Sequence, residues 1–308
     1  MSSIVIGAGP VGSTIALQLA DAGEPVRLLT RSGSGPEHPL IERRQADAGD
    51  LAALAAAFAG ATAVYDCMHA SAYRADVWRA ELPRAEAAVL EAAGHVGAVV
   101  VFPESLYSYG HVSGPMTETT PRHADFGKAA VRVELLRARE RSATPTVSVA
   151  ASDFYGPLVR QAHAGERMVP TVLAGRTMRV LGDADVPHSW TYVPDLAAAM
   201  IRAARDTTLW NSVLHAPTAA PLTQRQLVAQ YAGAAGVPVP KVATIPAGLL
   251  RAVGVVHRDT REMAEMSYQF TRPFVLDSSA SEARLGLAPT PLAEGIGATV
   301  AWWRDGAR

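Results

Sequence analysis

Three glycines near the start of the chain have the spacing that brings a backbone close to phosphate groups. Gly7, Gly9 and Gly12 form a Gly-x-Gly-x-x-Gly pattern, which follows the apolar run 3–6 and precedes the alanine- and leucine-rich stretch 13–22. The first glycine allows a tight turn, the second lets the backbone approach a pyrophosphate, and the third allows a helix to pack closely on a strand. The helix N-terminus adds free N–H groups and a positive dipole end. The pattern predicts a dinucleotide site formed by Gly7, Gly9, Pro10, Val11 and Gly12.

The end of the second predicted strand indicates which dinucleotide is bound. This strand ends at Thr30, and Arg31 and Ser32 follow. Folds that bind NAD place an Asp or Glu at this point for the ribose hydroxyls. A carboxylate would repel a 2′-phosphate, whereas an arginine and hydroxyl groups attract it. The sequence therefore favours NADP(H), with Arg31 on the phosphate or the adenine. Arg43 and Arg44 are alternative partners, and a solvated Arg31 without a ligand is the other interpretation.

Strands and helices are predicted to alternate from the N-terminus to about residue 150. The unbroken apolar character of the fifth strand, 97–102, is typical of a parallel strand that is buried on both faces. The alternation predicts an α/β fold with a doubly wound parallel sheet, the Rossmann arrangement, in which ligands bind outside the carboxyl ends of the strands. The loops at these ends should surround one crevice. They supply further predicted cofactor contacts at Asp47, Ala48, Cys67, Met68, His69 and Phe102.

The pattern changes after residue 150, where proline and glycine become frequent and the segments irregular. A helix is predicted over 193–205, with a proline in its first turn. The stretch 245–274 has the character of helices and loops. We predict three parts: an NADP-binding domain over 1–150 and 187–216, a small, mostly helical substrate-binding subdomain over 151–186 and 217–290, and a packing helix within 291–308.

Composition argues against several classes of function. The 28 basic and 29 acidic residues nearly cancel, and no basic tract is interleaved with aromatic residues, so a nucleic-acid partner is not expected. The single cysteine, Cys67, cannot form an internal disulfide and fits a reducing cytoplasm. No apolar run is long enough for a membrane span, and the glycine pattern leaves no room for a signal peptide. The spacing of His, Cys and acidic residues predicts no metal site.

Four further motifs follow the glycine pattern in a fixed order. They are Glu-Ser-Leu-Tyr-Ser-Tyr-Gly at 104–110, Met-Thr-Glu at 116–118, Asp-Phe-Tyr-Gly-Pro at 153–157 and Thr-Tyr-Val-Pro-Asp at 191–195. Together they make the chain resemble the extended and atypical short-chain dehydrogenases/reductases, a group that includes nucleotide-sugar epimerases and dehydratases. The resemblance covers nearly the whole chain and implies hydride transfer between a nicotinamide and a substrate carbon. A monomer or a homodimer is expected.

The resemblance implies that Ser105 is catalytic and hydrogen-bonds the substrate carbonyl. The family also uses a Tyr as proton donor and a Lys four residues later. The best register puts Phe126 at the tyrosine and Ala130 at the lysine, and neither side chain can do that chemistry. Aligning Lys128 with the family lysine puts Ala124 at the tyrosine. Neither register restores the pair. Lys128 and Phe154 complete the predicted cofactor contacts.

Three interpretations follow from this departure. The substrate supplies its own proton, for instance from a phenol or enol beside its ketone; or another side chain replaces the tyrosine; or the fold only senses the dinucleotide. Candidate replacements near the strand ends are Tyr107, Tyr109, Tyr155, Lys128 and His69.

The substrate side of the sequence favours a flat hydrophobic molecule. Nucleotide-sugar members of the family carry an Arg that grips the sugar diphosphate, and His188 aligns with it. A neutral imidazole is a poor substitute for a guanidinium. We therefore predict an NADPH-dependent ketoreductase of polycyclic aromatic polyketides in antibiotic biosynthesis, resembling the atypical angucyclinone ketoreductases. An NADP(H) sensor and a nucleotide-sugar epimerase or dehydratase are the alternatives. Predicted substrate contacts are Tyr73, Glu104, Phe126, Tyr155, His188 and Trp190.

Overall fold

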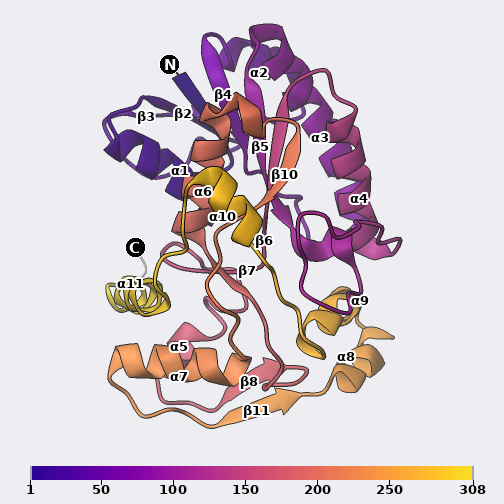
Figure 1. Cartoon of the computed structure of the whole chain (residues 1–308), viewed down its shortest axis with the longest axis vertical. Coiled ribbons are helices and arrows are strands. Elements are labelled where there is room, and N and C mark those ends of the chain that lie inside the picture. Colours follow the sequence, from indigo (N-terminus) through magenta and orange to yellow (C-terminus); the bar gives the residue numbers. More distant parts are fainter. Residues whose placement is uncertain (1, 307–308) are drawn as a thin grey trace.

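A parallel seven-stranded sheet forms the larger part of the molecule (Figure 1). The computed structural model describes residues 2–306. The strand order is β10-β6-β5-β4-β1-β2-β3, so the chain moves outward from β1 in one direction and then returns to build the other half. Ligands of such sheets bind where the order reverses, which here is between β1 and β4. The strands are β1 (Ser2–Ile6), β2 (Val26–Thr30), β3 (Ile41–Gln45), β4 (Ala61–Asp66), β5 (Val99–Ser105), β6 (Thr146–Ala151) and β10 (Ser212–His215).

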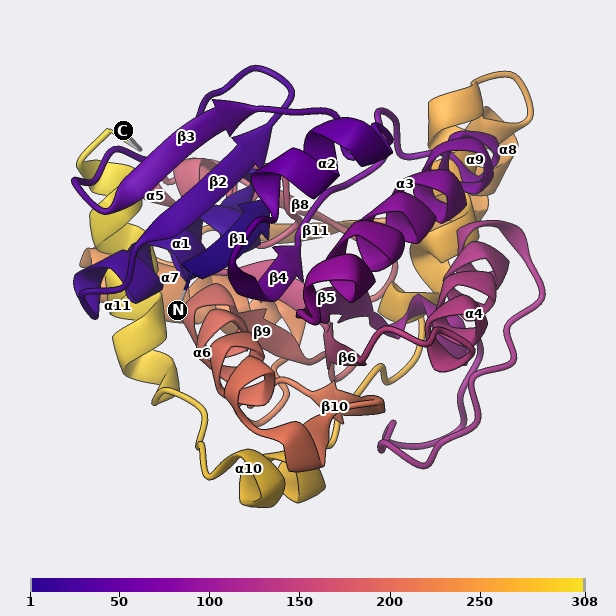
Figure 2. The same ribbon diagram turned by 90° about the horizontal axis from the view of Figure 1, so that it is seen from above.

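Helices cover both faces of this sheet, as Figure 2 shows from above. Successive strand residues point to opposite faces. Ile4 and Val64 therefore join one apolar core and Val5 and Tyr65 the other. One face carries α1 (Pro10–Asp21) and α6 (Val193–Arg205); the other carries α2 (Leu51–Ala57), α3 (Ala75–Val96) and α4 (Gly127–Glu140). The predicted doubly wound α/β fold is confirmed.

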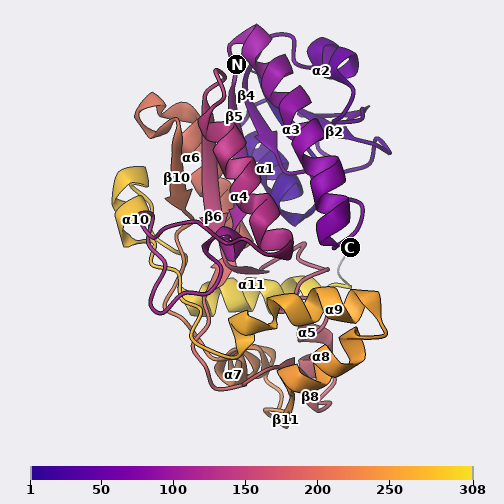
Figure 3. The same ribbon diagram turned by 90° about the vertical axis from the view of Figure 1, so that its right-hand side faces the viewer.

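A smaller group of elements lies beyond the carboxyl ends of the strands, at the lower end of Figure 1. Its helices α5 (Val169–Leu173) and α7 (Gln224–Ala235) pack together, and α11 (Leu292–Arg304) packs on both. Two short parallel pairs complete it: β8 (Met178–Leu181) with β11 (Val242–Ile245), and β7 (Asp153–Tyr155) with β9 (Trp190–Tyr192). Figure 3 shows α8 (Ala247–Gly254) and α9 (Arg258–Glu265) on its flank, in orange.

The remaining elements are short. The 3₁₀ turns are η1 (Leu106–Tyr109), η2 (Thr207–Leu209) and η3 (Met266–Phe270). Helix α10 (Ser279–Leu285) packs on α6 and β10 of the main sheet, although the sequence predicted it within the substrate-binding subdomain. No helix in the described part of the chain is long and apolar enough to cross a membrane.

The fifth strand differs from its prediction at both ends. It was predicted over 97–102 and is observed over Val99–Ser105. Gly97 has φ +70° and ends α3 in the left-handed conformation, so the strand starts later. At the other end the ladder with β6 continues as far as the pairing of Ser105 with Ala151. Phe102 therefore lies inside the strand and not at its end.

Candidate functional site

The glycine loop joins β1 to α1 and has the geometry that a dinucleotide needs. Gly7 has φ +92°, and a Cβ there would lie 2.8 Å from the carbonyl oxygen of Cys67. A Cβ on Gly12 would overlap the carbonyl oxygen of Gly7. These two glycines are required by the backbone itself. A Cβ on Gly9 would meet no atom within 4 Å, so this position faces open space in front of the α1 N-terminus. The residues present fit a bound pyrophosphate.

The loop after β2 leaves one arginine available to a ligand. Thr30 Oγ1 donates to the carbonyl oxygen of Ser34, and the hydroxyls of Ser32 and Ser34 lie 2.7 Å apart, which orders the turn. Arg31 is exposed and forms no ion pair with any residue from 2 to 306. The alternatives on β3 are engaged, because Arg43 pairs with Glu37 and Arg44 with Glu42.

The loop after β4 lies beside the glycine loop, with Cys67 packed against Gly7 and Gly12. Met68 is half-buried, and its N–H donates to Asp66 Oδ1 at 3.3 Å. Burial raises the pKa of Asp66 to about 7, and the Glu86 carboxylate contributes in the same direction. His69 is exposed and meets the Trp78 ring edge-on at 5.2 Å. Asp47 and Ala48 lie in the loop after β3, where Asp47 Oδ1 accepts from Gly49 N.

Asp66→Asn should remove a pH dependence of stability between about pH 4 and pH 7. Because its pKa is raised from 3.8 to about 7 on folding, the folded protein holds this proton more tightly than the unfolded chain. The unfolding free energy then falls as pH rises through that window. Between pH 5 and pH 8 the wild type should lose about 2 to 3 kcal/mol more than the variant, measured by urea unfolding. Equal losses would contradict this.

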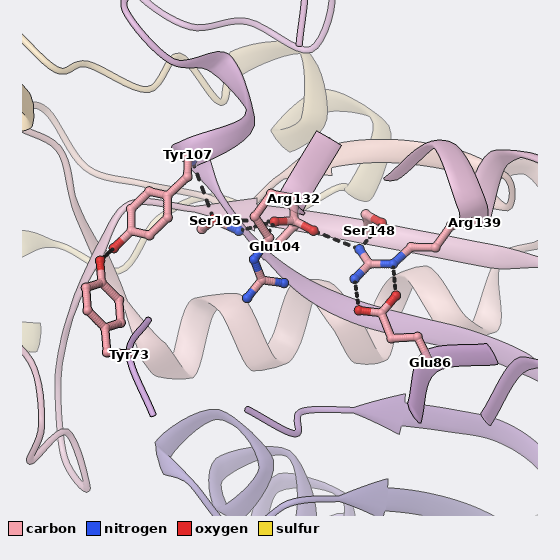
Figure 4. Close-up of polar contacts among 8 residues, drawn as sticks. All are labelled: Tyr73, Glu86, Glu104, Ser105, Tyr107, Arg132, Arg139 and Ser148. Atoms are coloured by element: carbon pink, nitrogen blue, oxygen red, sulfur yellow. Dashed lines mark hydrogen bonds and ion pairs between the residues drawn. The ribbon is translucent and has the colours of Figure 1, made fainter. Parts of the chain in front are cut away.

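Ser105 ends β5, and its hydroxyl lies within a hydrogen-bonded network (Figure 4). The hydroxyl donates to Glu104 Oε1 and accepts from Tyr107 N, each at 3.4 Å. Glu104 Oε1 also accepts from Ser105 N at 2.8 Å. The Nε of Arg132 lies 3.5 Å from the same oxygen. The carboxylate of Glu104 therefore fixes the end of the strand at the predicted catalytic serine.

Glu104 itself was predicted to contact substrate, and that prediction is wrong. Glu104 is 2% exposed, and its Oε2 accepts from Arg139 Nη1 at 2.8 Å. Arg139 in turn forms two bonds to Glu86, at 2.8 and 2.6 Å. Since residues two apart on a strand share a face, Phe102 points the same way and lies under the Arg139 guanidinium at 3.9 Å. The predicted cofactor contact of Phe102 is therefore also wrong.

The N-terminus of α4 carries no tyrosine. Phe126 is the N-cap residue, and Ala130 lies in the first turn. The Phe126 ring lies 5.3 Å from His111 and 5.9 Å from Tyr268, so it belongs to an aromatic cluster. Neither Phe126 nor Ala130 offers a proton at this position.

Lys128, a predicted cofactor contact, is fully buried and is held by the smaller part of the molecule. Its Nζ lies 2.5 Å from Glu262 Oε2 and 3.2 Å from Glu265 Oε1, both on α9. It also donates to the carbonyl oxygen of Glu262 at 3.1 Å and lies over the ring of Tyr73. Because both carboxylate partners lie on α9, the ammonium group of Lys128 is directed to that helix. The prediction that Lys128 contacts the cofactor is therefore wrong.

Two tyrosines form a wall beside Ser105. The hydroxyls of Tyr73 and Tyr107 lie 2.7 Å apart, and the Tyr107 ring stacks on Trp78 (Figure 4 shows the tyrosine pair). Burial raises the pKa of Tyr107 to about 12, so this phenol is protonated at neutral pH. Tyr73 is 39% exposed, and its contact with substrate stays a prediction.

Three other predicted substrate contacts are buried in the protein. His188 is 1% exposed and stacks with Phe270 and Phe274. Trp190 is 3% exposed and donates to the carbonyl oxygen of Leu222. Tyr155 is 1% exposed and packs on Gly295. Tyr155 and Trp190 belong to the apolar core of the smaller part, and His188 stacks on Phe270 of the same core, so direct substrate contact is not supported. Phe154 is half-buried against the main core, and its cofactor contact stays a prediction.

Sequence reasoning missed three carboxylates that hold predicted site residues in place. Asp153 pairs with His188, and it lies within one of the quoted motifs, where a strand-end carboxylate was a usable signal. Glu262 and Glu265 lie in a segment whose sequence gives no indication of its partners. Over the described range 2–306, no group of three or more His, Cys, Asp or Glu residues is arranged to hold a metal ion.

Comparisons with known proteins agree with this geometry. The model of a family described as the NAD dependent epimerase/dehydratase family matches residues 3–211. UDP-glucose 4-epimerase from Thermotoga maritima, solved with UDP-glucose, has a similar structure: TM-score 0.79, 19% identity, 100% of both chains covered. A double mutant of the dTDP-glucose 4,6-dehydratase DesIV from Streptomyces venezuelae, solved with NAD and DAU, has TM-score 0.80 and 20% identity over 99% of this chain and 97% of that one.

A third similar structure is WbmH from Bordetella bronchiseptica in complex with NAD+, with TM-score 0.76 and 19% identity over 99% of this chain and 98% of that one. No curated protein sequence matches the chain. At these identities the likeness to solved structures shows the fold.

Proposed function

Because the chain belongs to the NAD dependent epimerase/dehydratase family, we propose that it is a nicotinamide-dinucleotide-dependent oxidoreductase that acts on a carbon held beside Ser105. The observation that carries this proposal is the position of Ser105. It lies at the carboxyl end of β5, next to β4, and therefore at the edge of the sheet that also carries the glycine loop. Such an edge is where ligands of open α/β sheets bind.

The Ser105 hydroxyl can turn from its long 3.4 Å contact with Glu104 Oε1 and donate to a substrate oxygen on which negative charge develops. In ketone reduction a hydride adds to the carbonyl carbon, the π electrons move to oxygen, and a proton completes the alcohol. The bound dinucleotide supplies the hydride. A fixed donor at the oxygen lowers the barrier because it needs no reorganisation at the moment of reaction. Glu104 and Arg139 hold the end of the strand that carries this donor.

The proton has no source at the start of α4, because Phe126 and Ala130 cannot donate one. We propose that the substrate or water supplies it. A ketone with a neighbouring phenol or enol is polarised by its internal hydrogen bond and has a proton within reach. The paired phenols of Tyr73 and Tyr107 are the alternative source within the chain.

For the substrate, we propose a hydrophobic polycyclic aromatic ketone of polyketide type. The rings of Tyr73, Trp78 and Tyr107 pack together beside Ser105, and Tyr73 is 39% exposed. The family arginine for a sugar diphosphate has His188 at its aligned position, and that residue is buried. Together these features favour a flat neutral ligand over a charged one.

A nucleotide-sugar epimerase or dehydratase is the second candidate. It is favoured by the similar structures, two of which are named as enzymes of this kind. Such an enzyme oxidises and then reduces its substrate, so it keeps its dinucleotide and consumes none. It also needs an acid–base group near Ser105, for which the paired tyrosines are the candidates.

One experiment separates these functions. The purified protein is mixed with NADPH and a panel of polycyclic aromatic ketones, and the nicotinamide absorbance is followed together with product mass. Loss of absorbance with a gain of two hydrogens supports the reductase. Conversion of UDP-glucose or dTDP-glucose with retained NAD+ and no net consumption supports the second candidate. Tight NADPH binding without any turnover supports a dinucleotide sensor.

Arg31→Ala should raise the KM for NADPH by about tenfold or more and leave the KM for NADH nearly unchanged. A charge-assisted hydrogen bond from Arg31 to a 2′-phosphate is lost, and NADH has no such phosphate. Steady-state kinetics with both coenzymes measure the effect. Arg44→Ala is the matched control, because Arg44 already pairs with Glu42 and should change neither value. Equal losses for both coenzymes in the Arg31 variant would show that Arg31 does not distinguish them.

A further inference from the structure

Asp153 lies close to the Tyr73–Tyr107 pair beside Ser105. Burial raises the pKa of both phenols, and the negative charge of Asp153 contributes in the same direction. Ala151 pairs with Ser105 at the end of the β5–β6 ladder, and Asp153 follows two residues later as the first residue of β7. Its side chain is 24% exposed. The oxygen Oδ2 lies 2.7 Å from His188 Nε2. The other oxygen, Oδ1, forms no hydrogen bond with any group that the structure describes. The oxygen Oδ2 is therefore hydrogen-bonded to His188, and Oδ1 is free to accept a hydrogen bond from a ligand.

His188 has no N–H left for a ligand. Its Nδ1 lies 3.2 Å from the carbonyl oxygen of Gln269, and its Nε2 lies 2.7 Å from Oδ2 of Asp153. Each ring nitrogen therefore already faces an acceptor within the protein. Stacking against Phe270 and Phe274 fixes the ring in this orientation. Both polar edges of the imidazole are thus occupied within the protein, and Asp153 is the member of the pair that is accessible, with 24% of its side chain exposed.

The cation of α4 that α9 holds is also occupied. Lys128 lies between Glu262 and Glu265, so this side of the crevice carries two carboxylates for one ammonium group. A phosphate group that approaches Asp153 meets an acceptor where it needs donors. A substrate hydroxyl group that approaches Asp153 finds an acceptor for its O–H. Asp153 therefore favours a neutral hydroxylated ketone over a nucleotide sugar, which carries a diphosphate.

We propose that Asp153 is a specificity-determining residue whose Oδ1 accepts a hydrogen bond from a neutral hydroxyl group of the substrate. His188 is the positioning residue that fixes the carboxylate. The inference rests on the proposed function, since it concerns the substrate of the same site. It adds that the ketone carries a free hydroxyl group, distinct from any hydroxyl bonded to its own carbonyl, and that diphosphates are disfavoured.

The test measures binding and needs no turnover. The protein is saturated with NADP+ and titrated by calorimetry at pH 6.5 with 5-, 6- and 7-hydroxy-1-tetralone, with the three methyl ethers and with UDP. In the wild type at least one hydroxytetralone should bind about tenfold more tightly than its methyl ether. Asp153→Ala should reduce that ratio to about one. UDP should show no measurable binding to the wild type.

Two variants keep this test interpretable. Asp153→Asn retains a hydrogen bond to His188 and a neutral acceptor, so it should fold and show an intermediate ratio, because charge-assisted bonds are the stronger ones. Asp185→Asn is the control, because this exposed carboxylate pairs with Arg225 and should leave the ratio unchanged. A general loss of structure would weaken both members of each pair equally and would not move the ratio.

The proposal is overturned if no hydroxytetralone is preferred over its ether, if the preference persists in Asp153→Ala, or if UDP binds as tightly as the tetralones. Because NADP+ is used, these results are independent of hydride transfer. A lost preference with intact NADPH consumption removes the role of Asp153 alone. An intact preference without NADPH consumption removes the proposed reduction alone.

Discussion

Replacing Lys128 by methionine should lower the free energy of unfolding by about 3 to 5 kcal/mol. Lys128 is fully buried, and its ammonium group is the cation between the carboxylates of Glu262 and Glu265. Methionine fills a similar volume and carries no charge, so it leaves the two carboxylates close together without their cation. Removing one partner of a buried ion pair is costly for this reason. Urea unfolding of the two proteins at neutral pH measures the difference.

The chain provides a matched control for this prediction. Arg79 on α3 and Glu134 on α4 also form an ion pair between elements, but both side chains are about half exposed. Solvent and salt screen such a pair, so Arg79→Gln should cost less than about 1 kcal/mol. The triple variant Lys128→Met, Glu262→Gln, Glu265→Gln should recover much of the loss because no uncompensated charge remains. A loss below about 1 kcal/mol for Lys128→Met alone would contradict the prediction.

The same contacts explain why α9 lies where it does. Glu262 Oε2 accepts from the backbone N–H of Ala75, the first residue of α3. Glu265 Oε1 accepts from the N–H of Lys128 in the first turn of α4. Both carboxylates thus satisfy helix N-termini, where negative charge is favourable. Gly127 leaves the space for this, since a Cβ there would overlap the Glu265 carboxylate. These ion pairs and hydrogen bonds therefore join α9 of the smaller part to α3 and α4 of the main sheet domain.

The sequence predicted the sheet because that information is local. A glycine pattern between a strand and a helix, followed by regular alternation, specifies a doubly wound sheet with few alternatives. Gly7 and Gly12 have their predicted roles because the same spacing forces the same close approach of backbone atoms. A short motif singled out Ser105 beyond a strand predicted to end at residue 102, and the structure makes it the last residue of β5.

The partners of the site residues were not predictable in the same way. Lys128 and Glu262 are 134 residues apart in the sequence, and nothing in either segment specifies the pairing. The burial of His188 depends on Phe270 and Phe274, which come from a segment that reads as loops and helices. The error at Glu104 had a different origin. The strand was predicted to end at residue 102, which put Glu104 in the loop beyond it, whereas the observed strand reaches Ser105 and puts Phe102 and Glu104 on one face.

Ser105→Ala should lower kcat for the proposed reduction by about 10²- to 10³-fold, the usual effect of removing one fixed donor from a developing oxyanion. The KM for NADPH should stay nearly constant, because Ser105 lies at β5 and the glycine loop at β1 remains intact. Ser108→Ala is the control from the neighbouring 3₁₀ turn. Ser108 is fully buried, and its hydroxyl has no hydrogen-bond partner among residues 2–306, so turnover should be unchanged.

The size of the effect also bears on the source of the proton. If the substrate polarises its own carbonyl through an internal hydrogen bond, Ser105 adds less, and the loss should be smaller for ketones with a neighbouring phenol than for ketones without one. If Tyr107 supplies the proton, Tyr107→Phe should lower kcat for both kinds of ketone alike, since its hydroxyl pairs with Tyr73 whichever substrate is bound. Unchanged turnover in Ser105→Ala with every ketone would remove Ser105 from the mechanism. The acidic group that completes the reaction would then have to be sought on the tyrosine wall, which is where the chain retains phenol protons next to the crevice.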